Sequence, residues 1–389
     1  MCKVFPVVFF FWRSIRMFKD YVGFGALGEA LLALEHEKYT RVFVVASENG
    51  WKRFNQNGIQ SFFPGRECFF FSDFSNNPDF SEIQRGTALY HDFKPDLIVA
   101  IGGGSPIDVA KVIKILAHTR EEYDPQLPAT LKPSGDGPPL VAIATTAGSG
   151  SETTRYAVFY RGENKQSIAH AAIRPEIAIV DPELTYAMPP RLTAETGFDA
   201  LSQAVEAYWN SFTTPEAQEH AASAIRLILP NLYNAVHEPT PNNRYHMAIA
   251  AYQAGKAIQI TRTTIPHALG YHLTKRYGLA HGHAVAVTLP IMLLINCDPA
   301  VEIITPAGPE AHRAAMQDLI HLLGQETPED AAAFWCNLMK ACGLESTLAE
   351  VGVKTEEQVK TLLESLNNTN LGTHPVAVDT DLLMRYFRK

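Results

Sequence analysis

The segment from Ile98 to Leu116, IVAIGGGSPIDVAKVIKIL, restricts the possible folds more than any other part of the sequence. A continuous apolar run leads into Gly102, Gly103, Gly104 and Ser105, and Pro106 follows where a first helical turn tolerates proline. Glycines let the backbone approach a pyrophosphate closely, and the free N–H groups at a helix N-terminus favour an anion. We therefore predict a strand–turn–helix unit that binds the phosphates of a nucleotide through residues 102–105.

Short apolar runs that resemble strands recur through the first half of the chain, at residues 41–46, 67–72, 96–101, 140–145 and 176–181. Their apolar residues are continuous rather than alternating, as expected for strands that are covered on both faces. Helical patterns lie between several of them, notably at residues 80–93 and after Gly104. This order predicts an α/β fold with a parallel, doubly wound, Rossmann-like sheet.

The second half of the chain has a different pattern. Long helical periodicities occur at residues 197–209, 221–236, 246–258 and 330–343, without a convincing strand between them. The pair Pro189-Pro190 is a plausible boundary, and a length of 389 residues suits two domains. We predict a nucleotide-binding α/β domain at residues 1–188 and an all-α, metal-binding catalytic domain at residues 189–389.

Composition excludes some classes of function. A net charge of −8 argues against nucleic acid as the main partner. The five cysteines are scattered and never in CxxC spacing, which fits a reducing, cytoplasmic compartment.

The apolar run at residues 4–12 is too short to span a membrane. We expect an extended or strand-like N-terminus there, with a targeting segment or a misassigned start as alternatives.

Two further small-residue segments could contact a cofactor. GFGALG at residues 23–28 matches a dinucleotide fingerprint, with Glu48 placed 20 residues later, but the run before it is short and polar. A turn leading into a helix is the simpler interpretation. ATTAGSGSETT at residues 144–154 also follows a strand, and its hydroxyls could bind ribose or nicotinamide; the candidates are Thr145, Thr146, Ser149 and Ser151.

Four histidines occur in IPHALGYHLTKRYGLAHGHAVAV, residues 265–287. His267 and Tyr271 are four residues apart, and His281 precedes an apolar run. In the helix at 197–209, Asp199, Gln203 and Glu206 share one face, and a carboxylate on such an apolar helix needs a partner. One carboxylate and two imidazoles from separate helices would form a three-ligand divalent metal site. Satisfied core histidines are the alternative.

Five motifs in the same order resemble the iron-containing (group III) alcohol dehydrogenase family, from about residue 23 to 292. They are GGGSPIDVAK (102–111), TTAGSGSETT (145–154), IVDPEL (179–184), TGFDAL (196–201) and HG (281–282) before AVAVTLP. The resemblance implies the dehydroquinate synthase-like fold, with an active site in the cleft between an α/β and a helical domain. It also implies a homodimer or larger homo-oligomer.

The resemblance implies a metal site at Asp199, Gln203, His267 and His281. The family pattern has a histidine where this chain has Gln203, and a neutral carbonyl oxygen is a poorer ligand than imidazole. The metal is therefore held more weakly, or by three residues and water. Iron, zinc or cobalt would suit these ligands. Tyr271 stands where many members have a histidine near the substrate, so Tyr271 and His272 are candidate catalytic residues.

DALSQAVEAYW, TTIPHALGYHLT and LAHGHAVAVTLP resemble a phosphonoacetaldehyde reductase subgroup of this family. That resemblance implies reduction of phosphonoacetaldehyde to 2-hydroxyethylphosphonate, and a dianionic substrate needs nearby cations. Arg155 is the preferred candidate, Arg262 is the second, and Lys165, Lys275 and Arg276 are others.

Cofactor choice rests on the end of the second strand. Family members that use NAD often have an aspartate there, whereas VFVVASENG places Ser47 at that position, with Lys52 and Arg53 close in sequence. We predict NADPH, with NADH as the alternative if Glu48 replaces the aspartate. The complete set of candidate cofactor-binding residues is Ser47, Asn77, Gly102, Gly103, Gly104, Ser105, Asp108, Thr145, Thr146, Ser149 and Lys165.

Three alternatives to a phosphonoacetaldehyde reductase remain. The same fold could act on simple aliphatic or diol-derived aldehydes. The dehydroquinate synthase branch shares the architecture but needs more basic and polar residues around the metal. A catalytically impaired, nucleotide-binding protein would explain Gln203.

Overall fold

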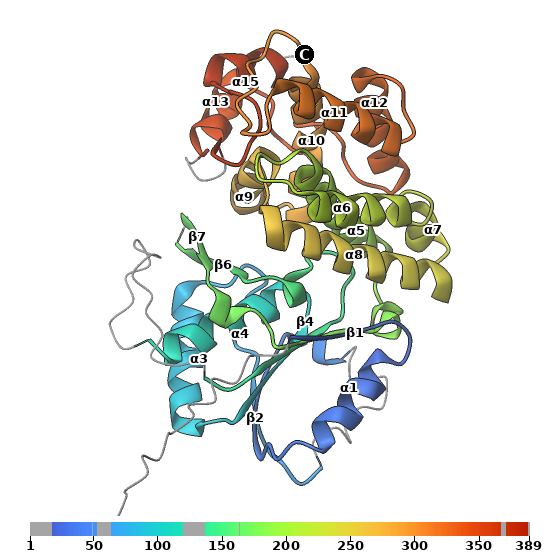
Figure 1. Ribbon diagram of the computed structural model, residues 1–389. Helices are drawn as coiled ribbons and strands as arrows, with labels where there is room; N and C mark the ends of the chain where they lie inside the picture. Colours follow the sequence, from blue (N-terminus) through green and yellow to red (C-terminus); the bar gives the residue numbers. More distant parts are fainter. Residues whose placement is uncertain are drawn as a thin grey trace, which may run out of the picture.

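The computed structural model describes residues 18–48, 50–52, 64–119, 137–162, 164–366 and 371–387. An α/β half, built from the first part of the chain, lies below a wholly helical half in Figure 1. The apolar run at residues 4–12, for which we predicted an extended N-terminus, lies outside the described residues.

A six-stranded, entirely parallel sheet forms the centre of the α/β half. Its order is β1-β8-β5-β4-β2-β3. The strands are β1 (Lys19–Val22), β2 (Arg41–Ala46), β3 (Glu67–Phe71), β4 (Leu97–Gly102), β5 (Leu140–Ala144) and β8 (Ile177–Val180). The prediction of a parallel sheet is confirmed, and all five predicted strands are present within two residues. The sequence analysis missed β1, a short edge strand that is partly polar.

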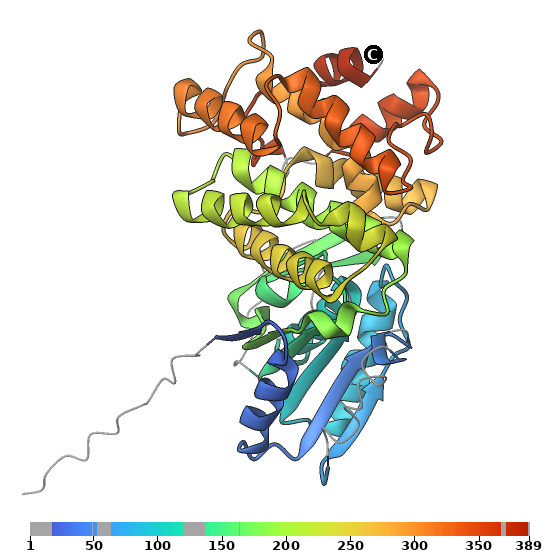
Figure 2. The ribbon, with the colours of Figure 1, turned by 90° about the vertical axis from the view of Figure 1, so that its right-hand side faces the viewer.

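Both faces of this sheet are covered, which explains the continuous apolar runs. Phe43, Ile98 and Ala142 face one core, formed with α3 (Phe80–Phe93) and α4 (Gly104–Ala117). Val44, Val99 and Ile143 face a second core with α1 (Ala26–Glu35). Alternate residues of a strand point to opposite faces, so every position must be apolar. Figure 1 shows α3 and α4 on one side of the sheet and α1 on the other, and Figure 2 views the sheet from the α1 side.

The strand order reverses between β2 and β4. From β2 the chain moves outward to β3, then returns to β4 on the other side and continues to β5 and β8. Ligands of open α/β sheets bind at the carboxyl ends of the strands that flank such a reversal. Ser47 follows β2 and Gly103 follows β4, so both candidate cofactor residues lie at this point.

A second sheet of two antiparallel strands, β6 (Tyr156–Arg161) and β7 (Asn164–Ala169), was not predicted. In Figure 1 this hairpin rises from the α/β half toward the helical half. Single 3-10 turns occur at η3 (Ser151–Thr153), η4 (Ala171–Ile173) and η5 (Pro182–Thr185).

The second half of the chain is helical, as predicted. Its helices are α5 (Pro190–Trp209), α6 (Pro215–Ile228), α7 (Leu232–His237), α8 (Pro241–Thr261), α9 (Ile265–Tyr277), α10 (His281–Cys297), α11 (Pro309–Leu322), α12 (Pro328–Ala341), α13 (Glu356–Glu364) and α15 (Thr380–Phe387). They share one large apolar core, which includes Phe198, Trp209 and Trp335. Helices in the described residues are too short or too polar to cross a membrane. A domain boundary at residue 188 stays a prediction.

Candidate metal centre and cofactor site

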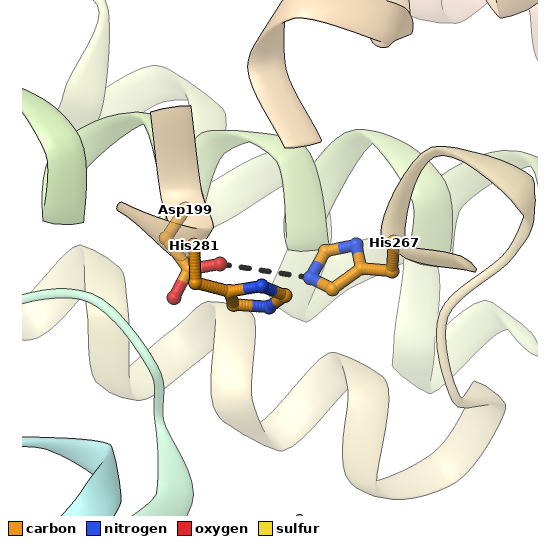
Figure 3. A group of neighbouring side chains, drawn as sticks. All are labelled: Asp199, His267 and His281. Atoms are coloured by element: carbon orange, nitrogen blue, oxygen red, sulfur yellow. Dashed lines mark ion pairs between the residues drawn. The ribbon is translucent and has the colours of Figure 1, made fainter. Parts of the chain in front are cut away.

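Asp199, His267 and His281 come from three helices, α5, α9 and α10, and converge on one point (Figure 3). One potential ligand atom from each residue lies within 4.8 Å of the other two. The Asp199 Oδ1 and His267 Nε2 atoms are 3.6 Å apart, and the rings of His267 and His281 are 5.3 Å apart between centroids. The grouping that the sequence indicated is therefore present in the folded chain, and metal ligation by these residues stays a proposal.

The donor atoms of this group fit a divalent cation. Asp199 Oδ1, Gln203 Oε1 and His267 Nε2 are buried and have no hydrogen-bond partner among the described residues. A buried polar atom without a partner is costly, so Asp199 Oδ1 and His267 Nε2, which are 3.6 Å apart, favour a cation between them. Burial lowers the pKa of His281 to about 4, and the neutral imidazole is the form that binds metal. A mixed N/O donor set of this kind suits iron or zinc.

A buried glutamate holds His267 in its orientation. Glu206, on α5, is completely buried, and its Oε2 accepts a hydrogen bond from His267 Nδ1. Its Oε1 accepts bonds from the Thr264 amide and hydroxyl at 2.9 and 2.8 Å. Nδ1 of His267 is thereby occupied and Nε2 is directed at Asp199. The sequence analysis placed Glu206 on the correct helix face but gave it no role; its need for a partner was the available signal.

Replacing Glu206 by glutamine is expected to weaken metal binding about 10–100-fold, the usual effect of losing a carboxylate behind a metal-binding histidine. The amide cannot accept the Nδ1 proton as a charged carboxylate does. Competition with a chelator measures the affinity. Glu216→Gln, at an exposed position in the first turn of α6, removes the same charge and should leave the affinity unchanged. Equal metal affinities in the parent protein, Glu206→Gln and Glu216→Gln would show that Glu206 does not orient a metal ligand.

Gln203 lies one turn after Asp199 on α5 and points its amide toward the α/β half. Its Nε2 donates a hydrogen bond to the Ser149 carbonyl oxygen at 3.2 Å, and this bond fixes the amide. Its Oε1 is the buried atom without a described partner. Gln203 also lowers the pKa of Asp199, together with His267 and His281, against the opposing effect of burial. The residue thus links the candidate metal centre to the segment at 145–151.

The approach of α10 to α5 depends on Gly282, the residue after His281. A methyl group at Gly282 would overlap the Glu195 carbonyl oxygen and would lie 2.7 Å from Asp199 Cβ. These are backbone and near-backbone atoms of α5, so a side-chain rotation cannot relieve the overlap. Only glycine lets the first turn of α10 come close enough to bring His281 to Asp199.

Tyr271 and Lys165 form a stack above this centre. The Tyr271 ring lies parallel to the His281 ring, at 4.8 Å and 17°, and the Lys165 ammonium lies 3.2 Å from the Tyr271 ring centroid. Burial raises the pKa of Tyr271 well above its usual value and lowers that of Lys165 to about 7. Lys275, one turn beyond Tyr271, sits over the Tyr160 ring, so α9 contacts the β6–β7 hairpin twice.

His272 does not share the helix face of His267 and Tyr271, because it lies five residues after His267 on α9. Burial and the neighbouring charge of Arg276 lower its pKa. Its Nε2 is buried without a partner in the described part of the chain. A catalytic role for His272 stays a prediction that these contacts do not support.

The two glycine-rich segments predicted to bind cofactor lie against each other. A Cβ on Gly103 would lie 3.0 Å from Thr146 Oγ1, and one on Gly104 would lie 3.1 Å from Ser149 Oγ. Gly102 has φ of 150°, in the range that favours glycine. The Thr145 amide donates to the Gly102 carbonyl oxygen, and the Thr145 hydroxyl is buried without a described partner. Together they form one backbone-lined surface at the N-terminus of α4.

Asp108 and Lys111, on α4, fix the second of these segments. Asp108 accepts bonds from the Ser151 hydroxyl at 2.6 Å and the Val158 amide at 2.9 Å. Lys111 donates to Ser151 and to the Tyr156 carbonyl oxygen, at 2.7 to 2.8 Å. Both carboxylate oxygens of Asp108 thus have protein partners, so the residue is placed to position the 145–154 segment.

The remaining predicted cofactor residues lie around the strand-order reversal. Ser47 caps the turn after β2, where its hydroxyl accepts a bond from the Gly50 amide at 3.1 Å. Glu48 forms an exposed ion pair with Lys52 at 2.7 Å, and Arg53 lies outside the described residues. Asn77 is exposed, and the Ser105 hydroxyl donates to the carbonyl oxygen of its neighbour Asn76.

GFGALG at residues 23–28 forms a turn into α1, the simpler of the two interpretations. The Leu27 amide at the start of α1 already donates to Asp181 Oδ2, at 3.1 Å. A carboxylate from the chain itself thus occupies the position where a phosphate would bind. β1 also lies at the sheet edge beside β8, away from the order reversal.

The two arginines predicted to contact substrate line one cavity of about 360 Å³. Its lining residues are Arg155, Tyr156, Phe212, Ile260, Thr261, Arg262, Gly372 and Thr373. Arg155 and Arg262 come from opposite halves of the chain and were predicted separately. The fold brings them together.

Comparison with known proteins gives family matches along almost the whole chain. Residues 19–182 match the family described as iron-containing alcohol dehydrogenase, and residues 193–389 match the C-terminal part of the Fe-containing alcohol dehydrogenase family. The NADPH-dependent butanol dehydrogenase of Clostridium saccharobutylicum is 30% identical over 323 residues, which is 80% of each protein.

Two relatives act on aldehydes with an anionic group, according to their names. The phosphonoacetaldehyde reductase of Streptomyces viridochromogenes is 36% identical over 262 residues, which is 64% of this chain and 66% of that protein. The sulfoacetaldehyde reductase of Bifidobacterium kashiwanohense, solved in complex with NAD+, superposes with a TM-score of 0.84 at 30% identity, covering 95% of this chain and 96% of that one. Other relatives are matched over a smaller part of their own length, down to 35%.

Proposed function

Because this chain belongs to the iron-containing alcohol dehydrogenase family, and is an NAD(P)-dependent oxidoreductase acting on CH–OH groups, we propose that it reduces phosphonoacetaldehyde to 2-hydroxyethylphosphonate. The observation that carries the chemical part of this proposal is the convergence of Asp199, His267 and His281. Within the described residues, Asp199 Oδ1 and His267 Nε2 are buried there without a hydrogen-bond partner.

The reaction transfers a hydride from C4 of the reduced nicotinamide to the aldehyde carbon, while a proton is added to the carbonyl oxygen. Asp199, His267 and His281, together with Gln203, would hold a divalent metal, which would supply Lewis-acid polarisation of that oxygen when bound. Tyr271 stays protonated because burial raises its pKa, so its hydroxyl can donate a hydrogen bond beside His281.

The cofactor is proposed to bind across the strand-order reversal. The backbone amides after Gly102 donate hydrogen bonds to the pyrophosphate at the N-terminus of α4, and Thr145, Thr146 and Ser149 contact the nicotinamide half. Lys165 reaches this region from β7. We propose NADPH as the preferred cofactor, because Ser47 does not repel a 2′-phosphate and because Lys52 lies nearby, although Glu48 already pairs with it.

The substrate assignment is supported by the Streptomyces and Bifidobacterium relatives, whose named substrates both join an aldehyde to a tetrahedral anionic group. Simple aliphatic or diol-derived aldehydes are the second candidate, favoured by the Clostridium butanol dehydrogenase.

The four cysteines in the described residues are unpaired, which supports a cytoplasmic location. A homodimer or larger assembly is proposed on family resemblance and is measurable by analytical ultracentrifugation.

A panel of aldehydes tests the substrate proposal. We expect kcat/KM for phosphonoacetaldehyde to exceed that for propanal and 3-hydroxypropanal by at least about 100-fold, the effect of one or two charge-assisted hydrogen bonds. The same assay with NADH and NADPH tests the cofactor proposal. Equal kcat/KM for all three aldehydes would assign a general alcohol dehydrogenase, and a strong preference for NADH would refute the choice of NADPH.

A further inference from the structure

We propose that Thr264 and Trp209 are positioning residues of the candidate metal centre, and that they act on His267 through Glu206. This inference rests on the proposed reductase function, because it concerns the metal centre on which that function depends. Neither residue belongs to the group of potential metal ligands. Thr264 is fully buried and Trp209 is 2% exposed, so their polar atoms must find partners inside the protein.

The direction of each hydrogen bond on this path follows from the chemistry of the donors. Trp209 Nε1 lies 3.1 Å from Thr264 Oγ1, and an indole nitrogen can only donate. The single hydroxyl proton of Thr264 is therefore left for Glu206 Oε1, which lies 2.8 Å away. Trp209 thus turns the Thr264 hydroxyl toward Glu206 and holds it there.

These bonds hold Glu206 as an acceptor. Its Oε1 receives the amide and the hydroxyl of Thr264, and the His267 amide approaches the same oxygen at 3.4 Å. Its Oε2 is left to accept from His267 Nδ1. A proton kept on Nδ1 makes Nε2 the nitrogen that faces Asp199, at 3.6 Å (Figure 3). The orientation of the Thr264 hydroxyl therefore contributes to the choice of the His267 nitrogen that a cation can bind.

Glu206 also caps the helix that carries His267. Thr264 is the N-cap residue of α9, and its own side chain makes no capping bond. Free amides at a helix N-terminus need acceptors, and a carboxylate is favoured there by the helix dipole. Glu206 supplies this acceptor from α5, so the bonds that orient the His267 ring also fix the first turn of α9, in which His267 lies.

The link between α8 and α9 brings Thr264 to this position. It turns at Arg262, whose φ of 67° lies in the range that favours glycine. Asn210, at the end of α5, donates to the Arg262 carbonyl oxygen at 3.3 Å. Thr373 donates to the Thr263 carbonyl oxygen at 2.9 Å. Both bonds hold the link, so the fold itself fixes the position of Thr264.

Competition between the protein and a chelator for Zn2+ tests the inference without any chemical step. Thr264→Val removes the hydroxyl and keeps the shape of the side chain, and Zn2+ affinity should fall about tenfold, the lower end of the usual loss behind a metal-binding histidine. Thr264→Ser restores the hydroxyl and should keep the affinity within about twofold of the parent. Trp209→Phe should cause a smaller loss than Thr264→Val, because the Thr264 hydroxyl can still donate to Glu206 but is no longer fixed.

Matched controls separate this role from a general loss of stability. Thr185→Val removes a buried hydroxyl that donates to the Pro182 carbonyl oxygen. Trp335→Phe removes a buried indole N–H that donates to the Ala286 carbonyl oxygen. Both controls should lower the Tm of the metal-free protein, as the test variants do, but leave the Zn2+ affinity unchanged.

Parent Zn2+ affinity in Thr264→Val or in Trp209→Phe would overturn the role of the residue concerned. An equal loss in Thr264→Ser, or in the two controls, would overturn the inference as a whole. If Thr264→Val does not fold, Trp209→Phe decides the outcome, since the phenylalanine ring fills most of the same space.

The aldehyde assay keeps this inference separate from the proposed function. Zn2+ affinities in the expected order, in a protein that reduces no aldehyde, would refute the reductase and leave the positioning roles intact. Aldehyde reduction by a parent protein whose Zn2+ affinity is the same in every variant would leave the reductase intact and overturn the positioning roles. A parent protein that binds no Zn2+ would overturn both.

Discussion

In a His267→Ala variant, bound metal is expected to fall from about one equivalent per chain to a small fraction, and kcat to fall by at least about 10³-fold. His267 lies between two carboxylates, Asp199 and Glu206, and the partnerless Nε2 is its contribution to the donor set. Burial opposes its protonation, but Glu206 and Asp199 outweigh burial and raise the pKa of His267 to about 9. The two carboxylates therefore favour a positive charge here, and a bound metal ion would supply it by replacing the proton on Nε2.

Elemental analysis of the purified protein and steady-state kinetics with propanal measure the two effects. His321→Ala, at a half-exposed position on α11, removes an imidazole elsewhere in the helical half and serves as control. Truncation leaves Glu206 Oε2 without its His267 partner and costs on the order of 1–3 kcal/mol, so the far-UV circular dichroism and Tm of the variant are compared with those of the parent. Full turnover by a metal-stripped His267→Ala protein would refute the whole scheme of metal-assisted reduction.

Gly282→Ala is expected to lower metal affinity and activity by at least about tenfold although it removes no ligand. The added methyl would overlap the Glu195 carbonyl oxygen and press on Asp199, so α10 must move away from α5 and carry His281 with it. Overpacking of this kind costs about 1–3 kcal/mol of stability. The expected phenotype is therefore a lower Tm together with a weaker metal site.

Gly28→Ala provides the matched control for this variant. A Cβ at Gly28 has no atom within 4 Å, and the residue lies inside α1, where alanine favours the helix by up to about 1 kcal/mol. The same methyl group should therefore be neutral or stabilising there. Normal metal content and kcat in Gly282→Ala would mean that the contact between α10 and α5 does not position His281.

Much of the α/β half could be predicted from local patterns. The five predicted strands are present because residues such as Val44 and Ile98 must be apolar on both faces of a buried parallel strand. β1 and the hairpin β6–β7 were missed, because NKQSIA has half-exposed positions and no strong periodicity. That hairpin carries Lys165 to Tyr271, a contact that only the paired strands create.

In the candidate site, too, some features could be predicted from the sequence and others depended on the fold. Spacing placed Asp199, Gln203 and Glu206 on one helix face and indicated His267 and His281 as partners, and family resemblance identified the metal ligands among them. The sequence could not assign Glu206 to His267, because the two lie 61 residues apart and meet only when α5 packs near α9. Nor could it bring Arg155 beside Arg262, since β6, β7 and all of α5 to α8 lie between them in the chain.

Local sequence patterns were sufficient to predict the parallel sheet, the helical second half and the types of side chain available to bind a metal and a nucleotide. These properties depend on periodicity, glycine placement and side-chain chemistry, which are local. The folded chain was needed to show which buried donor atoms lack a partner among the described residues, which carboxylate orients which histidine, and where two arginines share one ring. These depend on how helices approach one another, and a close contact such as Gly282 against Glu195 is fixed by three-dimensional packing rather than by neighbours in the chain.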